Sequence, residues 1–387
     1  MSTLKILFVL NNVFVTGNGL AASARRTIKE LRDAGHDVRV LSGNNSDPNG
    51  PQPEFCIPQT RIWIVDFLAK SQGYCFARHD KKVIEDAVNW ADVIHLEEPF
   101  YLQMYTARVA RRLGKPCTAT YHLHPENILA AIGMHRCTRI GDLVVRFWRN
   151  TVFNLCTDVQ CPTQNVHDRL ARLHFKPRLH TISNGLILNK LPHIYPENEI
   201  AAPFNLICIG RLAREKDQKT LIRAVRYCRN ARNIQLLFLG RGPRQKQYQR
   251  WLDALVRDGV LQYPPIIKFL DYAGLTEKCR HADLYVHCAN VEVEGLSCLE
   301  ALQQEVVPVI AAGQITATSQ FALDERSVFP TGDARALAER IDYWIEHPAE
   351  RRQMARQYAE AMDNYDIRRS VKALVRMFEQ ATRKSND

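Results

Sequence analysis

The sequence predicts an α/β protein built from two domains, and two patterns lead to this prediction. Short apolar runs, typical of buried strands, alternate with helix-forming segments along most of the 387 residues. The alternation begins at residues 4–10 and starts again at residues 204–209. Between them, residues 191–203 contain three prolines and no hydrophobic periodicity, which is typical of a linker. The chain is long enough for two domains of roughly 100–200 residues.

The composition is that of a globular protein with an excess of positive charge. The apolar fraction is 46%, the charged fraction is 24%, and no apolar run is long enough for a transmembrane helix. The eleven cysteines show no CxxC pair or metal-binding spacing, and their odd number at buried-looking positions favours reduced thiols in the cytosol over a disulfide framework. Residues 101–180 hold twelve Lys/Arg and four acids, so this window carries +8 of the net +11. Such a window predicts an anionic partner: a phospholipid surface, a nucleic acid or an anionic substrate.

The first expected βαβ unit has glycines at its first turn. A strand at 4–10 precedes a loop with Gly17 and Gly19, a helix at 20–34 and a strand at 36–41. The two glycines would let backbone approach a diphosphate or an acceptor, although there is no GxGxxG motif. The alternative is a flexible turn without a binding role.

A histidine follows the next strands of this half. Residues 91–96 and 117–121 are expected strands, separated by a helix at 100–113, and His122 stands at the end of the second strand. Side chains at the carboxyl ends of parallel strands face the ligand crevice of an open sheet. His122 is therefore a candidate ligand contact, and His124 is the near alternative. A structural histidine bonded to backbone is the other interpretation.

A basic amphipathic helix is expected within residues 141–156. One face carries apolar residues at helical spacing, namely Val144, Trp148, Val152 and Leu155. The other face carries Arg146 and Arg149. Basic helices with aromatic residues can lie in a membrane interface, so we expect Arg146, Trp148 and Arg149 to face a membrane. The alternative is that the apolar stripe packs on the sheet. Nucleic acid is not the expected partner, because no nucleic-acid-binding signature is present.

The second half contains a candidate phosphate site. The strand at 204–209 is followed by Gly210, Arg211 and Lys216 in the segment GRLAREK. An arginine fork can hold two phosphate oxygens and a lysine adds a point charge. A solvated basic loop is the alternative interpretation.

The segment 283–309 is the most informative part of the chain. It reads as a strand at 284–286, a loop, a helix at 297–304 and a strand at 306–310. Glu292 in the loop and Glu300 one turn into the helix can face one crevice, and carboxylates accept hydrogen bonds from sugar hydroxyls. The helix start would suit a diphosphate. The alternative is a capped, solvated helix start.

These motifs together resemble glycosyltransferase family 4. The resemblance rests on Glu-x7-Glu, on Gly295 three residues after the first glutamate, on the Pro-Val strand downstream and on GRLxxEK, and it covers essentially the whole chain. It implies a retaining enzyme of the GT-B fold, with two Rossmann-like domains facing across a cleft. We expect an acceptor domain at 1–190, a linker at 191–203, a donor domain at 204–360 and a helix at 361–387 that crosses back.

The resemblance also implies roles for individual residues. Gly210, Arg211 and Lys216 would hold the donor diphosphate, and Glu300 the ribose. Glu292 would bind sugar hydroxyls beside Gly295 and Leu296, and His122 would contact the sugar from the other domain. The loop with Gly17 and Gly19 would lie across the cleft. The chain lacks the Gly-Gly turn that the family often has within 311–319, so acceptor contacts there do not carry over.

The expected reaction is hexose transfer from a UDP-sugar. The sequence contains no Asp-x-Asp, so we expect no obligatory metal or other cofactor, with cations stabilising the leaving diphosphate. The basic window favours a membrane lipid acceptor, diacylglycerol or ceramide, and an enzyme peripheral on the inner face of the cell membrane. The runs HPEN, SNG and QFALDERS resemble bacterial glycolipid-synthesising members. Alternatives are a transferase that builds a surface polysaccharide and an inactive GT-B binding protein.

Overall fold

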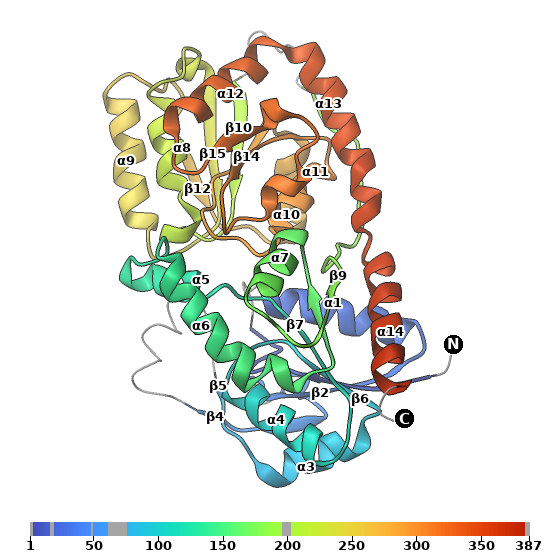
Figure 1. Ribbon diagram of the computed structural model, residues 1–387. Coiled ribbons are helices and arrows are strands. Elements are labelled where there is room, and N and C mark those ends of the chain that lie inside the picture. The colour runs from blue at the N-terminus through green and yellow to red at the C-terminus, as the bar shows by residue number, and fades with distance from the viewer. Residues whose placement is uncertain (1–2, 16–18, 48, 61–75, 196–202, 384–387) are drawn as a thin grey trace. The chain divides into compact units, whose positions relative to one another are not determined.

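The chain folds around two parallel β-sheets, each with helices on both faces (Figure 1). The computed structural model describes residues 3–15, 19–47, 49–60, 76–195 and 203–383. By their contacts these residues form two units, the first from 1–187 together with 367–387 and the second from 188–366. The predicted α/β class with two Rossmann-like domains is confirmed.

The sheet of the first unit has seven strands in the order β3-β2-β1-β6-β7-β8-β9. The strands are β1 (Lys5–Val9), β2 (Asp37–Gly43), β3 (Phe55–Ile57), β6 (Val93–Leu96), β7 (Cys117–Thr120), β8 (Asp158–Cys161) and β9 (Arg178–Thr181). A short antiparallel pair, β4 (Gln59–Thr60) and β5 (Phe76–Ala77), lies outside it. The strand order reverses between β1 and β6, and such a switch point is where open α/β sheets bind ligands.

Helices from both ends of the chain cover one face of this sheet. The unit contains α1 (Gly19–Asp33), α3 (Lys81–Trp90), α4 (Tyr101–Arg112), α5 (Pro125–Leu129), α6 (Thr138–Thr151), α7 (Gln164–Arg172) and α14 (Ile367–Arg383). Helices α1 and α14 lie side by side, while α3 and α4 cover the opposite face (Figure 1). Phe8, Ile28, Val38 and Phe378 belong to one buried core, so α14 is an integral part of the first unit.

The sheet of the second unit has six strands in the order β12-β11-β10-β13-β14-β15. The strands are β10 (Phe204–Ile209), β11 (Ile234–Leu239), β12 (Ile266–Lys268), β13 (Leu284–His287), β14 (Val307–Ala312) and β15 (Val328–Pro330). The helices are α8 (Gln218–Val225), α9 (Gln245–Arg257), α10 (Tyr272–Arg280), α11 (Leu296–Leu302), α12 (Ala334–Glu346) and α13 (Pro348–Ala361). The switch point here lies between β10 and β13.

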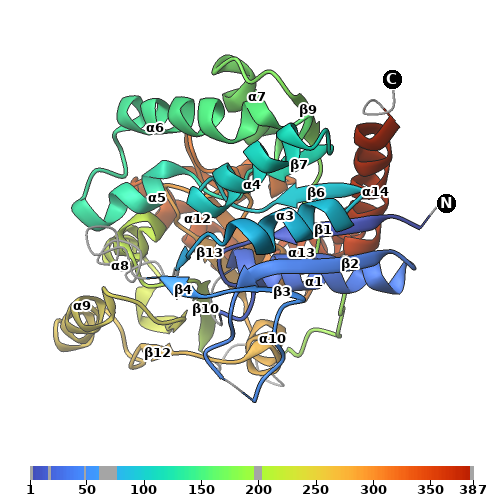
Figure 2. The same ribbon diagram turned by 90° about the horizontal axis from the view of Figure 1, so that it is seen from below.

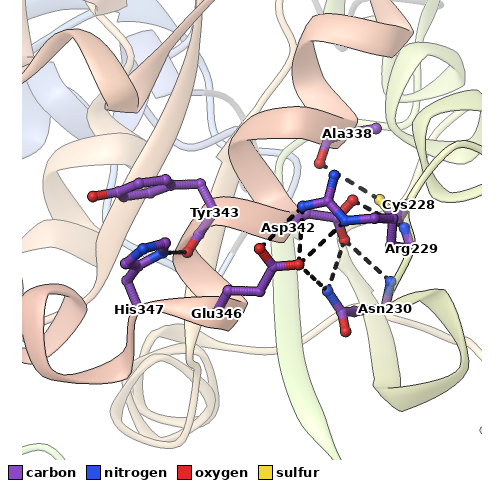
Figure 3. Close-up of polar contacts among 8 residues, drawn as sticks. All are labelled: Cys228, Arg229, Asn230, Ala338, Asp342, Tyr343, Glu346 and His347. Atoms are coloured by element: carbon purple, nitrogen blue, oxygen red, sulfur yellow. Dashed lines mark hydrogen bonds and ion pairs between the residues drawn. The ribbon is translucent and has the colours of Figure 1, made fainter.

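A polar network ties α12 to the turn that follows α8 (Figure 3). The buried carboxylate of Asp342 accepts hydrogen bonds from the backbone N–H groups of Arg229 and Asn230 at 2.9 and 3.1 Å. Glu346, one turn later, pairs with the exposed guanidinium of Arg229. The helix α12 ends at Glu346 with His347 as its C-cap, because Pro348 opens α13 and cannot continue the hydrogen bonding of α12.

Residues just after the first unit pack on the second. Asn189 N–H donates to Gln303 Oε1 at 2.9 Å, and Ile194 N–H donates to the carbonyl of Arg280 at 2.8 Å. The first part of the segment interpreted as a linker is therefore held by the second unit. Among the described residues, no helix has the length and apolarity that a membrane crossing requires.

Candidate functional site

Two loops meet at the switch point of the second sheet. Strand β10 leads into the loop with Gly210 and Lys216, and β13 leads into the loop with Glu292 and Gly295. Because β10 and β13 are hydrogen-bonded neighbours, their carboxyl ends bring these loops together. Asn290 N–H donates to the carbonyl of Glu215 at 2.8 Å, which joins the loops directly.

Lys216 and Glu292 form an ion pair between these loops. The side chain of Glu292 is 15% exposed and that of Lys216 is 23% exposed. Burial opposes ionisation of Glu292, but Lys216 and the neighbouring His287 outweigh it and lower the pKa of the carboxyl to about 2. Glu292 is therefore a carboxylate at neutral pH, beside a half-buried ammonium group.

The backbone of Glu292 is fixed on both sides. Its N–H donates to the carbonyl of Ile315 at 3.0 Å, and its carbonyl accepts from the N–H of Ala317 at 3.0 Å. Gly295 has φ +91°, and a Cβ there would lie 2.1 Å from Thr318 Cγ2. A glycine is therefore required at the turn that places Glu292 ahead of α11.

Buried polar groups contact the predicted phosphate loop and fix its conformation. Arg211 pairs with Glu215, whose side chain is almost wholly buried, and Gln218 Nε2 donates to the carbonyl of Arg211 at 2.8 Å. Gly210 has φ +141°, and a Cβ on Gly240 would approach the carbonyl oxygen of Gly210 to 2.0 Å. These contacts orient Arg211 and leave Lys216 to pair with Glu292.

The remaining predicted donor residues lie on α11. Leu296 begins this helix directly after Gly295, and Glu300 lies on it, half-buried. The helix begins one residue earlier and ends two residues earlier than the sequence pattern indicates. Gly210, Arg211, Lys216, Glu292, Gly295, Leu296 and Glu300 thus all belong to the second unit.

Two polar residues of this site were missed by sequence reasoning. His287 ends β13, with Nε2 3.5 Å from Glu292 Oε2 and Nδ1 2.7 Å from the hydroxyl of Tyr285. Burial lowers the pKa of His287. Asn290 is 7% exposed, and neither polar atom of its amide has a partner among the described residues. The position of His287 at a strand end was the signal that could have identified it.

The switch point of the first unit carries a buried carboxyl. Glu98 Oε2 accepts hydrogen bonds from Asn11 N–H at 2.7 Å, Asn11 Nδ2 at 2.6 Å and Gln103 Nε2 at 2.9 Å. Asn11 follows β1 and Glu98 follows β6, so this network bridges the switch point. Burial raises the pKa of Glu98 to about 7.

His122 contacts the other acidic residue of this turn. Its Nε2 lies 2.5 Å from Glu97 Oε2, and His95 Nε2 lies 3.5 Å from Glu97 Oε1. Burial opposes ionisation of Glu97, but the two histidines outweigh it and lower the pKa of Glu97. Glu97 directly follows β6, and its carboxylate orients His122.

His124 and the glycine loop are placed differently. His124 is fully buried, with Nδ1 3.0 Å from Arg169 Nη1, and Arg169 also pairs with Glu126. The alternative residue His124 therefore belongs to an internal ion-pair cluster. Gly19 begins α1, and Gly17 lies outside the described residues.

The expected membrane-facing residues need a correction. Trp148 is 5% exposed and its ring packs edge-on against Phe100, so Trp148 faces the interior of the first unit. Arg149 Nη1 donates to the carbonyl of Leu173 at 2.6 Å, whereas Arg146 is exposed. The outer face of α6 instead presents Leu143 and Phe147, with 62% and 61% exposure. The apolar stripe with Trp148 packs inward because burial of a tryptophan removes a large apolar area from water.

The cluster in the second unit is suited to a phosphorylated, hydroxyl-bearing ligand. Arg211 and Lys216 offer cationic donors, and Glu292 offers an acceptor for hydroxyl groups. The Asn290 amide has a donor and an acceptor for the same ligand. In the first unit, His122 is oriented by the carboxylate of Glu97.

Comparisons with family models and known proteins identify relatives. Residues 17–190 match the model "Glycosyltransferase Family 4", and residues 196–362 match "Glycosyl transferases group 1". A search of curated proteins found no match. Among solved structures, the catalytic domain of cholesterol-alpha-glucosyltransferase from Helicobacter pylori is 39% identical, with 42% of this chain and 100% of that domain covered and a TM-score of 0.38.

Two whole-length likenesses show the fold. Sucrose-phosphate synthase from Thermosynechococcus elongatus is 18% identical, with 97% of this chain and 98% of that chain covered and a TM-score of 0.71. HepE from Anabaena, in complex with UDP and glucose, is 16% identical, with 97% and 99% covered and a TM-score of 0.70. The predicted GT-B fold is confirmed.

Proposed function

This chain belongs to glycosyltransferase family 4, and from that premise we propose that it moves a hexose from a UDP-sugar to a membrane lipid. Membership makes it a nucleotide-sugar-dependent glycosyltransferase. The proposed hexose is glucose or galactose, and the proposed acceptor is diacylglycerol or ceramide. The product would be an alpha-glycolipid, formed with retention at the anomeric carbon.

The observation that carries the donor assignment is the ion pair between Lys216 and Glu292 at the switch point of the second sheet. In the proposal, Lys216 and Arg211 hold the diphosphate, with the backbone of Gly210 beside them. Glu292 holds hydroxyls of the sugar next to Gly295 and Leu296. Glu300 binds the ribose.

A second group of residues would act on the sugar from the first unit. His122 would donate or accept a hydrogen bond at a sugar hydroxyl, in an orientation set by Glu97. Gly17 and Gly19 would let the backbone of the loop that contains them approach the diphosphate or the acceptor. Attack on the donor would take place from the face that the diphosphate leaves, and cationic side chains would stabilise the negative charge that develops there. We expect chelators to leave the rate unchanged.

UDP-glucose is the first donor to test. HepE from Anabaena, which shares the fold, has been crystallised with UDP and glucose. The preference for UDP over other nucleotides otherwise rests on family frequency. GDP-sugars therefore serve as the comparison.

The lipid acceptor is supported by the surface of α6. On α6, Leu143 lies four residues after Arg139 and four before Phe147, Arg146 lies three residues after Leu143, and all four side chains are exposed. Exposed apolar side chains between arginines suit the interface of an anionic bilayer. Three acids of the basic window lie in ion pairs away from these four residues, because Glu126 and Asp142 contact Arg169 and Asp158 contacts Arg178. These three acids therefore do not neutralise the exposed Arg139 and Arg146.

A nucleoside diphosphate release assay tests the proposal. Purified protein is incubated with UDP-glucose, UDP-galactose and GDP-sugars, each with vesicles containing diacylglycerol, ceramide or cholesterol, and without lipid. Cholesterol is included because the related Helicobacter pylori domain is named for it. The proposal predicts UDP release that requires diacylglycerol or ceramide, with an alpha-linked glycolipid by mass spectrometry and NMR.

Other outcomes favour the alternatives. Release that requires soluble or lipid-linked sugars would indicate a polysaccharide transferase, and release without any acceptor would indicate a hydrolase. The absence of release with every donor would favour an inactive GT-B binding protein. Release with cholesterol but with no other lipid would support a membrane lipid acceptor and would exclude diacylglycerol and ceramide as that acceptor.

A further inference from the structure

A cavity of about 360 Å³ lies in the first unit, between α1 and the segment that precedes β3. Pockets for small molecules usually measure roughly 300–1,000 Å³ and have mainly apolar walls. None of the residues assigned above to sugar transfer lines this cavity. Its apolar walls are Val13, Phe14, Ile28, Val40, Pro51 and Pro53.

Hydrogen bonds join the walls of this cavity. Arg32 Nη2 donates to the carbonyl of Val38 at 2.7 Å and to Glu54 Oε1 at 2.7 Å. Glu54 Oε2 in turn accepts from the N–H of Val40 at 2.9 Å. These bonds fasten the segment before β3 to both α1 and β2. The cavity between them is thus part of the folded structure.

The charges around the cavity are not balanced. Arg32 pairs with Glu54, and Lys29 pairs with Asp33, so both acids of the lining are already engaged. Arg25 is half-buried, and its Nη1 donates to the carbonyls of Val13 and Val15 at 2.5 and 3.2 Å. Among the described residues, Arg25 contacts no carboxylate.

The remaining donors of Arg25 therefore lack an anion. Burial and the neighbouring Arg26 lower the pKa of Arg25, as expected for a cation without a counter-charge. A ligand that brings an anion to this point would gain a charge-assisted hydrogen bond. The apolar walls would at the same time cover a hydrocarbon chain.

We propose that the cavity binds a single-chain anionic amphiphile, a long-chain fatty acid, with its carboxylate on Arg25 and its chain against the apolar walls. A free sugar or a nucleotide fits poorly, because its hydroxyls would face apolar side chains without hydrogen-bond partners. A neutral lipid would leave Arg25 uncompensated. The proposal does not depend on the proposed sugar transfer.

Binding of a fluorescent polyene fatty acid to the full chain tests this proposal, at concentrations below micelle formation. Palmitate and hexadecanol compete with the probe and have chains of the same length, but the head group is an anionic carboxylate in one and a neutral hydroxyl in the other. Arg25→Gln removes the cation, and Ile28→Phe fills the cavity. Arg39→Gln is the matched control, because Arg39 neighbours Val40 on β2 but lies over the Trp90 ring at 4.4 Å.

We expect saturable binding of one probe per chain, displaced by palmitate at a concentration at least about tenfold lower than by hexadecanol. Arg25→Gln should weaken palmitate binding by about tenfold, and Arg39→Gln should leave it unchanged. Ile28→Phe should abolish binding with a cooperative thermal transition retained. If that variant does not fold, Val13→Leu narrows the same cavity.

Several results would overturn the proposal. The proposal would be wrong if the probe did not bind or if several probes bound to each chain. It would also be wrong if palmitate and hexadecanol displaced the probe at the same concentration. Equal weakening by Arg25→Gln and Arg39→Gln would show a general charge effect. Displacement by phosphatidylglycerol vesicles as efficient as by palmitate would assign the cavity to membrane phospholipid instead.

Discussion

Lys216 and Glu292 form an ion pair in the second unit although 76 residues separate them in the chain. The sheet order explains the contact, because β10 and β13 are neighbours and each leads into one of the two loops. Two motifs far apart in the sequence thus become one polar site at a switch point.

Replacing Glu292 with Gln should lower kcat for sugar transfer by about 100-fold, because the transition state loses a fixed charge at the sugar. Initial rates of UDP release measure the effect, and circular dichroism checks that the variant is folded. Glu339→Gln, at an exposed position of α12, is the control and should keep the wild-type rate. Unchanged turnover of Glu292→Gln would remove Glu292 from the site.

Glu97 should act through His122. Glu97→Gln is expected to lower kcat/KM by about tenfold, since a neutral amide orients and polarises the imidazole less well than a carboxylate. His122→Ala should lower it further, and the double variant should equal His122→Ala. A double-mutant cycle of kcat/KM measures this coupling. Additive effects would mean that the two residues act independently.

Glu98 should make stability depend on pH near neutrality. Burial raises the pKa of its carboxyl to about 7, although Asn11 and Gln103 donate hydrogen bonds that act in the opposite direction. Between its ordinary value of 4.5 and about 7, the folded protein holds a proton that the unfolded chain has released. Stability should therefore fall as pH rises through this window, and above it the loss should persist.

The variant Glu98→Gln isolates this effect, because the amide keeps an acceptor for Asn11 and carries no charge. Its Tm should exceed that of the wild type at pH 8, and the difference should shrink toward pH 5. Thermal melts between pH 5 and 8 measure both profiles. Parallel profiles of the two proteins would contradict the raised pKa of Glu98.

Asp342 should stabilise the second unit more than Glu346 does (Figure 3). Asp342→Ala leaves the backbone N–H groups of Arg229 and Asn230 without their buried acceptor, which should cost roughly 1–3 kcal/mol in the free energy of unfolding. Glu346→Ala removes an exposed pair with Arg229 and should cost clearly less, because water and salt screen an exposed ion pair. Urea denaturation compares the two, and equal losses would refute the assigned role of Asp342.

The outer face of α6 should mediate vesicle binding. Replacing both Leu143 and Phe147 with Ser should reduce co-sedimentation with anionic vesicles, because these exposed side chains would otherwise enter the interface. Leu323→Ser, at an apolar position of the second unit with 50% exposure, is the control. Binding of the wild type should also weaken as salt concentration rises. Equal sedimentation of the double variant and the control would exclude this face.

Much of the donor site could be predicted from the sequence because its residues lie in two contiguous motifs. Gly210, Lys216, Glu292 and Gly295 each follow an apolar strand within a few residues. Strand ends can be recognised from the pattern, and in parallel sheets they share one edge. The short strands β3 and β15 were not predicted.

Contacts between distant strand ends could not be predicted. Glu97 and His122 belong to different loops, and their contact depends on the neighbouring positions of β6 and β7 in the sheet. The hydrophobic periodicity of α6 also did not determine which face of this helix packs against the first unit. It identified the stripe that contains Trp148, but Leu143 and Phe147 form a second apolar pair on the opposite face.

The central claim is that the loop with Lys216, together with Glu292, binds the nucleoside diphosphate of a sugar donor. Isothermal titration of UDP into the wild type, Lys216→Ala and Lys219→Ala tests it most directly. Lys219 is an exposed cation three residues away, near the ring of Trp251. We predict that Lys216→Ala weakens UDP binding by at least about tenfold, since a charged hydrogen bond contributes roughly 1.5–3 kcal/mol, while Lys219→Ala binds like the wild type. Equal binding by all three proteins, or no binding by the wild type, would contradict the claim.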